Sequence, residues 1–204
     1  MGNAVARCKS SPYYVPTVAN QCYGVIPDID NGSRGNQFVN QSPFVGSTRG
    51  RGSHGVSITA RDCGSFGCDT DSCTTFVVVR DDQDPTITCP SDVWLDECSP
   101  YVDLNSFSAT ATDNCGIRAV NAIVDLNLPF SVGANTVQFE AIDTSGKRSR
   151  CSSAVYVQNV PPTITCPSDI TIQAGLDCTA ILPASFVPSV SDCGNNANWH
   201  VASG

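Results

Sequence analysis

The sequence PTITCPSD occurs twice without change, at residues 85–92 and 162–169. The two copies are offset by 77 residues, counted from Cys89 to Cys166. In each copy an apolar Ile lies between two Thr residues just before the cysteine, which is the period-two pattern of a half-buried strand. The stretch therefore indicates a β-strand that opens a repeated structural unit.

Other landmarks recur at nearly the same period. The offset is 78 residues from Cys115 to Cys193 and again from Cys73 to Cys151. The sequence LPFSVG at 128–133 also echoes SPFVG at 42–46. We predict three domains: a first repeat that lacks its opening strand (1–81), a complete central repeat (82–160) and the N-terminal half of a third repeat (161–204).

Composition places these repeats outside the cytosol. The chain has 204 residues and 12 cysteines, which are spread along it and predict a disulfide framework. Only 15% of its residues are charged, and the net charge of −8 argues against nucleic acid as a partner. No apolar run approaches the roughly 18 residues that a membrane span needs. We expect an extracellular or cell-surface protein.

The strand pattern inside a repeat predicts an all-β fold. Residues 136–142 and 152–157 alternate with period two, and the sequence DTSG at 143–146 between them predicts a turn whose Gly takes a positive φ. Several such strands in about 78 residues describe a small antiparallel sandwich.

The order of these motifs resembles the hyalin repeat (HYR) family. The motifs are Pro-x-Ile-x-Cys-Pro-x-Asp, Asp-Asn-Cys-Gly, Pro-Phe-x-Val-Gly, Ala-x-Asp-x-Ser-Gly and a late cysteine. The resemblance implies tandem immunoglobulin-like β-sandwiches, stapled by disulfides, of the kind found in matrix and adhesion proteins. The first repeat departs from the family: it has NQCY at 20–23 where Asp-Asn-Cys-Gly is expected, and an inserted segment between Cys63 and Cys68.

The cysteines suggest one short loop-closing bridge per repeat. The separations are 14, 17 and 15 residues for Cys8 to Cys22, Cys98 to Cys115 and Cys178 to Cys193. We predict these three pairs as disulfides, together with Cys63–Cys68 across the inserted hairpin and Cys89–Cys151 between the first and last strands of the central repeat.

Cys73 and Cys166 have no partner in this scheme. Cys73 takes the fourth cysteine position of the first repeat, and Cys166 takes the first position of the third repeat. Either their partners lie in further sequence, or Cys166 of one subunit bonds Cys73 of the next and the chains assemble head to tail into a filament.

Metal ligands are few in the sequence. Cys63, Cys68 and Cys73 lie near Asp69 and Asp71, but their four-residue gaps fit disulfides better than zinc. We predict no metal or cofactor except calcium, for which the first linker offers three acidic candidates: Asp81, Asp82 and Asp84. The second linker, at 157–162, has no acid.

Three surface features complete the predictions. A basic, Gly-rich loop at 47–55 is either a mobile loop or a contact for an acidic polysaccharide or subunit. Asn31 and Asn40 stand in N-glycosylation triplets. The two histidines, His54 and His200, lie far apart in the sequence, and no catalytic motif is present, so we predict that the chain is not an enzyme.

These observations predict an extracellular structural protein, a subunit or segment of a fibre, sheath or matrix that self-associates head to tail. The alternative is an adhesive ectodomain fragment that binds a glycan or a matrix protein.

Overall fold

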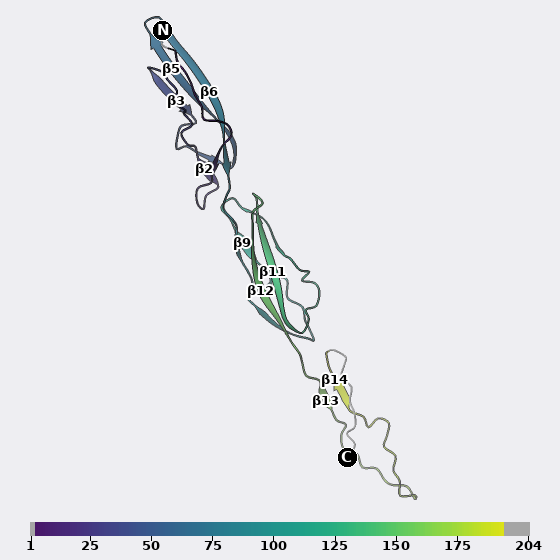
Figure 1. Cartoon of the computed structure of the whole chain (residues 1–204). Coiled ribbons are helices and arrows are strands. Elements are labelled where there is room, and N and C mark those ends of the chain that lie inside the picture. Colours follow the sequence, from purple (N-terminus) through teal and green to yellow (C-terminus); the bar gives the residue numbers. More distant parts are fainter. Residues whose placement is uncertain (1–2, 194–204) are drawn as a thin grey trace. The chain divides into compact units, whose positions relative to one another are not determined.

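The computed structural model describes residues 3–193, and the regular secondary structure of this range is entirely β-strand (Figure 1). The strands of its N-terminal part are β1 (Tyr13–Pro16), β2 (Tyr23–Val25), β3 (Phe38–Ser42), β4 (Thr48–Gly50), β5 (Gly52–Gly64), β6 (Gly67–Arg80) and β7 (Thr86–Thr88). The remaining strands are β8 (Val93–Asp96), β9 (Thr110–Thr112), β10 (Ile117–Ala122), β11 (Gly133–Asp143), β12 (Arg148–Gln158), β13 (Thr163–Thr165) and β14 (Ser189–Ser191). The predicted all-β fold class, tandem immunoglobulin-like sandwiches stapled by disulfides, is confirmed.

The described chain forms two compact units. Unit 1 comprises Met1–Thr88, Thr110–Asn121 and Glu140–Cys151, and unit 2 comprises Cys89–Ala109, Ala122–Phe139 and Ser152–Gly204. The three-repeat division at residues 81 and 160 stays a prediction. Within residues 3–193, no helix has the length and hydropathy that crossing a bilayer requires.

Unit 1 is built around the long β5–β6 hairpin. Its four-stranded sheet has the order β1-β6-β5-β3, and β2 pairs with β4 in a separate two-stranded sheet. Alternate residues of β5 are buried, namely Val56, Ile58 and Ala60, because successive side chains of a strand point to opposite faces. The hairpin therefore presents one apolar face to the interior.

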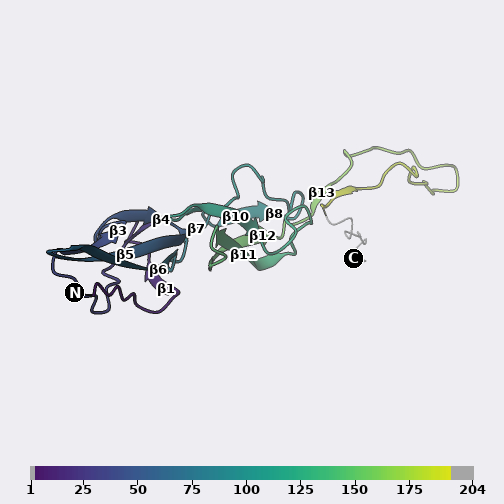
Figure 2. The same ribbon diagram turned by 90° about the horizontal axis from the view of Figure 1, so that it is seen from above.

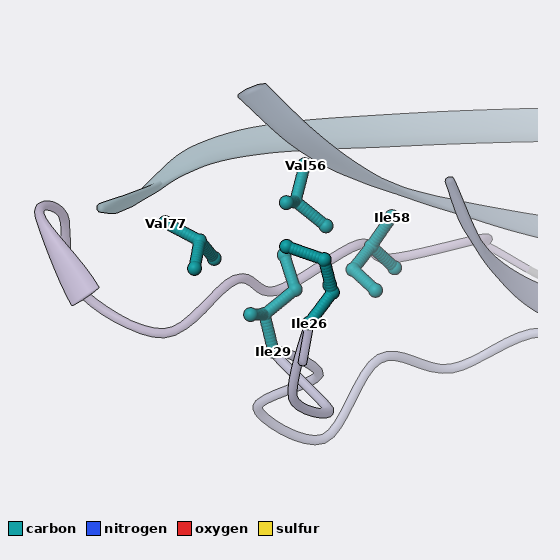
Figure 3. Packing of buried hydrophobic residues seen from close by; sticks show 5 residues of the cluster. All are labelled: Ile26, Ile29, Val56, Ile58 and Val77. Carbon is teal, nitrogen blue, oxygen red and sulfur yellow. The ribbon is translucent and has the colours of Figure 1, made fainter. Parts of the chain in front are cut away.

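The segment after β2 covers that face. Ile26 and Ile29 are fully buried and pack against Val56, Ile58 and Val77 from the hairpin. Figure 3 shows these five side chains gathered between the strands and the segment. Two layers thus enclose one hydrophobic core, as in a β-sandwich.

Near the N-terminus of the first repeat, residues 4–8 lie outside the named strands and make only isolated bridges. Residues 4–8 run antiparallel to residues 30–34, through the bridges Val5–Arg34 and Cys8–Asp30. The same pairing recurs between β7 and β9 and between β13 and β14. Residues 4–8 thus hold the place of an opening strand without forming a named one, and the absence of that strand from the first repeat stays a prediction.

One type of strand pairing is parallel, whereas the sequence predicted an antiparallel sandwich. In the first repeat β1 runs parallel to the end of β6, and in the central repeat β8 runs parallel to the end of β12. The central sheet has the order β10-β11-β12-β8. Figure 2 labels its four strands. Each cysteine that precedes such a parallel strand, Cys8 or Cys89, therefore holds the same position in its repeat.

In unit 2 the buried residues include Val137, Phe139 and Val155 from the central hairpin. Phe107 packs edge to face against Phe139, with ring centroids 5.7 Å apart. Beyond residue 160 the only described strands are β13 and β14, and many large apolar side chains of this segment are exposed. This segment has little core of its own.

Candidate functional site

A tight turn at the end of β11 fixes one carboxylate of unit 1. Gly146 has a φ of 92°, which confirms the predicted turn at 143–146. Asp143 is fully buried, and its Oδ1 accepts hydrogen bonds from the backbone N–H groups of Ser145 (2.7 Å) and Lys147 (2.8 Å). The turn therefore holds this side chain in one orientation through Oδ1 and gives no hydrogen bond to Oδ2.

Two more carboxylates lie beside it. Asp81 follows β6 and is 6% exposed; its Oδ2 accepts from the Ser145 hydroxyl (2.9 Å). Asp113 follows β9, and its Oδ1 accepts from the backbone N–H of Cys115 (2.8 Å). One carboxylate oxygen from each of Asp81, Asp113 and Asp143 lies within 4.8 Å of the other two. We call these three residues the aspartate cluster.

Several oxygens around the aspartate cluster have no hydrogen-bond donor. Oδ2 of Asp113, Oδ2 of Asp143 and the amide Oδ1 of Asn114 are all buried and unpaired among the described residues. Buried polar atoms are nearly always hydrogen-bonded, so three such atoms together mark an unusual place in the fold.

The basic side chains near the aspartate cluster bind other groups. Lys147 Nζ pairs with Asp84 (3.1 Å), and Arg51 donates to the hydroxyls of Thr144 (2.9 Å) and Ser145 (2.6 Å). The hydrogen bond to Asp84, with the charges of Asp84, Asp82 and Asp143, holds the pKa of Lys147 above its ordinary value. None of the ion pairs within residues 3–193 involves the aspartate cluster.

A disulfide adjoins the aspartate cluster. Cys22 is bonded to Cys115, with a Cα–Cα distance of 4.7 Å and a sequence separation of 93. Beside the bond, Asn114 Nδ2 donates to the backbone carbonyl of Gln21 (2.8 Å) and to the hydroxyl of Thr17 (3.3 Å). The same Thr17 hydroxyl donates to Asp81 Oδ1 (3.4 Å). The segment around Cys22 is thus tied to the DNCG motif by covalent and polar contacts.

Unit 2 contains a second bond of the same kind. Cys98 is bonded to Cys193, at a sequence separation of 95. In both bonds a cysteine that follows the parallel strand, β1 or β8, pairs with a cysteine that follows a short strand, β9 or β14. Each bond joins cysteines from consecutive predicted repeats.

The three short-range pairings predicted from spacing are therefore wrong: Cys8–Cys22, Cys98–Cys115 and Cys178–Cys193. Spacing along the chain favours closing a small loop, but the bonds that Cys8, Cys22 and Cys98 form have sequence separations of 65, 93 and 95. The NQCY sequence at 20–23 also misled the alignment, because Cys22 corresponds to Cys98 rather than to Cys115.

The continuity role predicted for Cys73 is also wrong, because Cys73 is bonded to Cys8 within the chain. Cys166 and Cys178 are exposed free cysteines in the structure. The predicted Cys63–Cys68 bond is confirmed. Cys89 and Cys151 are both disulfide-bonded, and their pairing with each other stays a prediction. Because Cys63, Cys68 and Cys73 are all bonded, no thiolate is available for the zinc alternative.

The structure separates the three predicted calcium ligands. Asp81 belongs to the aspartate cluster, whereas Asp82 and Asp84 are exposed, and Asp84 pairs with Lys147. Asp113 and Asp143 were not predicted as ligands: their DNCG and DTSG motifs indicated a repeat landmark and a turn. The shared repeat pattern was the one signal available, since it places both residues at turns.

The other predicted sites lie at the surface. The side chains of Asn31 and Asn40 are exposed. In the basic loop at 47–55, β4 pairs with β2, and Arg51 donates hydrogen bonds to the hydroxyls of Thr144 and Ser145. His200 lies outside the described residues.

No family model matches the chain. No curated protein matches it either. Among solved structures it is similar to the protocadherin gammaB4 extracellular domain, at 15% identity and a TM-score of 0.35, over 81% of this chain and 34% of that one. It is also similar to human protocadherin-24 EC1-2, at 16% identity and a TM-score of 0.33, over 78% of this chain and 100% of that one. The fibronectin(III)-like modules of Clostridium thermocellum CbhA match at 16% identity and a TM-score of 0.33, over 75% of this chain and 94% of theirs.

The chain spans about a third of the protocadherin gammaB4 chain. At these identities and TM-scores the likenesses carry no argument about function, and the fold class rests on the strand pairings. Ten of the twelve cysteines are disulfide-bonded, which indicates an extracellular or secreted location.

Proposed function

We propose that the chain is a load-bearing segment of an extracellular fibre, sheath or matrix, built from HYR-like repeats. One observation carries the proposal: the Cys22–Cys115 bond links two predicted repeats that the backbone already joins. The Cys98–Cys193 bond does the same one repeat later. A covalent link in parallel with each linker suits a protein that transmits tension.

The two bonds define a short covalent path through the chain. Tension applied at the ends passes from Cys22 to Cys115, then back along residues 98–115, and from Cys98 to Cys193. Residues 23–97 and 116–192 are bypassed, so their strands carry no load even when they unfold. The proposal therefore predicts a chain of low extensibility under oxidising conditions.

Single-molecule pulling between the two termini tests this path. Only residues 1–22, 98–115 and 193–204 bear load in the oxidised chain, so we expect a fully stretched length of about 17 nm, at roughly 3.5 Å per residue. After reduction all 204 residues extend, and the length rises to about 70 nm.

Pulling should be done in EDTA, so that bound cations have no part in the result. A Cys63→Ser/Cys68→Ser variant is the matched control, because that bond lies off the path and its loss leaves the oxidised length unchanged. An oxidised chain that extends by several tens of nanometres beyond 17 nm would contradict the load path.

We also propose that residues 161–204 are half of a third repeat, completed by a neighbouring subunit in head-to-tail assembly or by further sequence. The many exposed apolar side chains of this segment support the proposal, because burying them against a partner is favourable. They are Ile164, Ile170, Ile172, Leu176, Ile181, Leu182 and Val187. So small a half-sandwich cannot bury enough core by itself.

Sedimentation at increasing protein concentration tests the assembly. We expect the sedimentation coefficient to rise with concentration. The Cys166→Ser/Cys178→Ser variant should assemble equally, because the other ten cysteines are disulfide-bonded and offer no thiol for a head-to-tail bond. A chain that stays monomeric in sedimentation at all concentrations would contradict the assembly.

A monomeric chain would favour the alternative function, an adhesive ectodomain. One surface feature supports this alternative. Trp94 is 63% exposed and stacks on Tyr156 with ring centroids 5.2 Å apart, and such aromatic surfaces are common in binding sites. Glycans attached at the exposed Asn31 and Asn40 are compatible with either function.

A further inference from the structure

We propose that Asp81, Asp113 and Asp143 together bind one calcium ion. The inference does not depend on the load-bearing function, because it rests on the unsatisfied oxygens and the charge of the aspartate cluster.

The first argument is the state of the buried oxygens. Asp143 is fully buried and its Oδ1 is held by two backbone N–H groups, yet its Oδ2 receives no hydrogen bond and no solvent. Asp113 repeats the arrangement, with Oδ1 bound to the Cys115 N–H and Oδ2 buried and unpaired. Leaving such acceptors unpaired is costly, and a cation in contact with them removes the cost.

The second argument is charge. Three carboxylates come within 4.8 Å of one another, and none of them forms an ion pair with a described Lys or Arg. Lys147 pairs with Asp84 instead, and Arg51 binds hydroxyl groups. A divalent cation among the three side chains would neutralise most of this repulsion, which is strong where water is excluded.

The third argument is the chemistry of the donors. The aspartate cluster offers only oxygens, and the unpaired amide oxygen of Asn114 follows Asp113 directly in the chain. Calcium takes six to eight such oxygens in flexible geometry and accepts water for the remainder. Zinc prefers thiolate and imidazole, and the neighbouring Cys22 and Cys115 are bonded to each other. The donor set therefore fits calcium.

Calcium would join three segments that are distant in sequence. Asp81 follows β6, Asp113 follows β9, and Asp143 ends β11, and the Cys22–Cys115 bond adjoins the same place. We therefore expect calcium to stabilise the folded form of unit 1. For a dissociation constant in the range of about 0.1–1 mM, typical of extracellular modules, 10 mM calcium should raise the melting temperature by about 3–10 °C.

The test uses the full oxidised chain, stripped of metal with EDTA and dialysed. Isothermal titration with CaCl2 should show close to one site per chain, and the melting temperature should rise with calcium. Asp143→Asn keeps an acceptor for the two backbone N–H groups but replaces the free oxygen with an NH2 group, so binding and the thermal shift should both be lost.

Asp125→Asn is the matched control. The Oδ1 of Asp125 also accepts a backbone N–H, from Asn127 (2.9 Å), but this residue is exposed and lies outside the aspartate cluster, so calcium binding should persist. If Asp143→Asn fails to fold, Asp81→Asn takes its place. No calcium heat and no thermal shift at 10 mM in the unmodified chain, or a full shift in the folded Asp143→Asn variant, would overturn the proposal.

Discussion

Replacing both members of the Cys8–Cys73 bond by alanine is expected to lower the free energy of unfolding of the first repeat by about 2–5 kcal/mol. The bond closes a loop with a sequence separation of 65, for which the chain-entropy model gives about 4 kcal/mol. It also ties residues 4–8 to β6, and both cysteines pack against the core cluster of Ile26 and its neighbours. The double variant therefore loses a cross-link and some packing together.

The Cys63→Ala/Cys68→Ala variant provides the comparison. This bond closes a loop with a separation of only 5, and Cys63 and Cys68 already face each other in the β5–β6 ladder. In the same chain-entropy model so short a loop gives about 2 kcal/mol, roughly half the value for Cys8–Cys73, so we expect the smaller loss.

Hydrogen exchange of the β5 and β6 amides locates both effects within the first repeat. Exchange is preferable to a single melting curve, because a chain with several sandwiches need not unfold in one step. Equal acceleration of exchange in the two variants would show that the Cys8–Cys73 bond adds nothing beyond a local staple.

The repeat pattern sufficed to predict the fold class. Alternation over residues 136–142 predicted a strand that the structure extends to Gly133–Asp143, and the DTSG turn after it forms as expected. These features depend on residues close together in sequence, where period and turn chemistry are direct physical signals.

The disulfide partners could not be predicted in this way. Cys22 and Cys115 are separated by 93 residues, and what brings them together is the parallel course of β1 along β6 and the place of Asp113–Cys115 beside it. A cysteine spacing of 14 to 17 residues carries no information about either. The local resemblance of NQCY to DNCG then made the wrong alignment attractive.

The aspartate cluster could not be predicted from the sequence for a related reason. Asp113 and Asp143 occur in turn motifs, where an acidic residue usually serves the backbone, and in both the Oδ1 atom does so. That the second oxygen is buried without a donor depends on the packing of distant segments. Of the three aspartates, only Asp81 was predicted as a calcium ligand, because it lies in an acidic linker.

Ile26→Ala is expected to cost about 2–5 kcal/mol of unfolding free energy, the usual range for removing most of a fully buried aliphatic side chain. Ile26 has no exposed surface and lies with Ile29 on the segment that follows β2, facing Val56, Ile58 and Val77 of the hairpin (Figure 3). Its backbone N–H donates to the Ser47 carbonyl (2.8 Å), which holds the segment in place, so the cavity left by the substitution cannot close fully. Urea denaturation of the oxidised chain, followed by exchange of the β5 and β6 amides, measures the loss.

Phe66→Ala is the control for Ile26→Ala, because it removes a larger apolar side chain from the turn of the same hairpin. Phe66 is 97% exposed, so its loss should change the free energy of unfolding by less than about 0.5 kcal/mol. The contrast separates burial from hydrophobicity as such: if Ile26→Ala cost no more than Phe66→Ala, the segment after β2 would not be the second layer of the sandwich. The β5–β6 hairpin would then need another cover for Val56, Ile58 and Val77, and the two-layer architecture of the first repeat would fail with it.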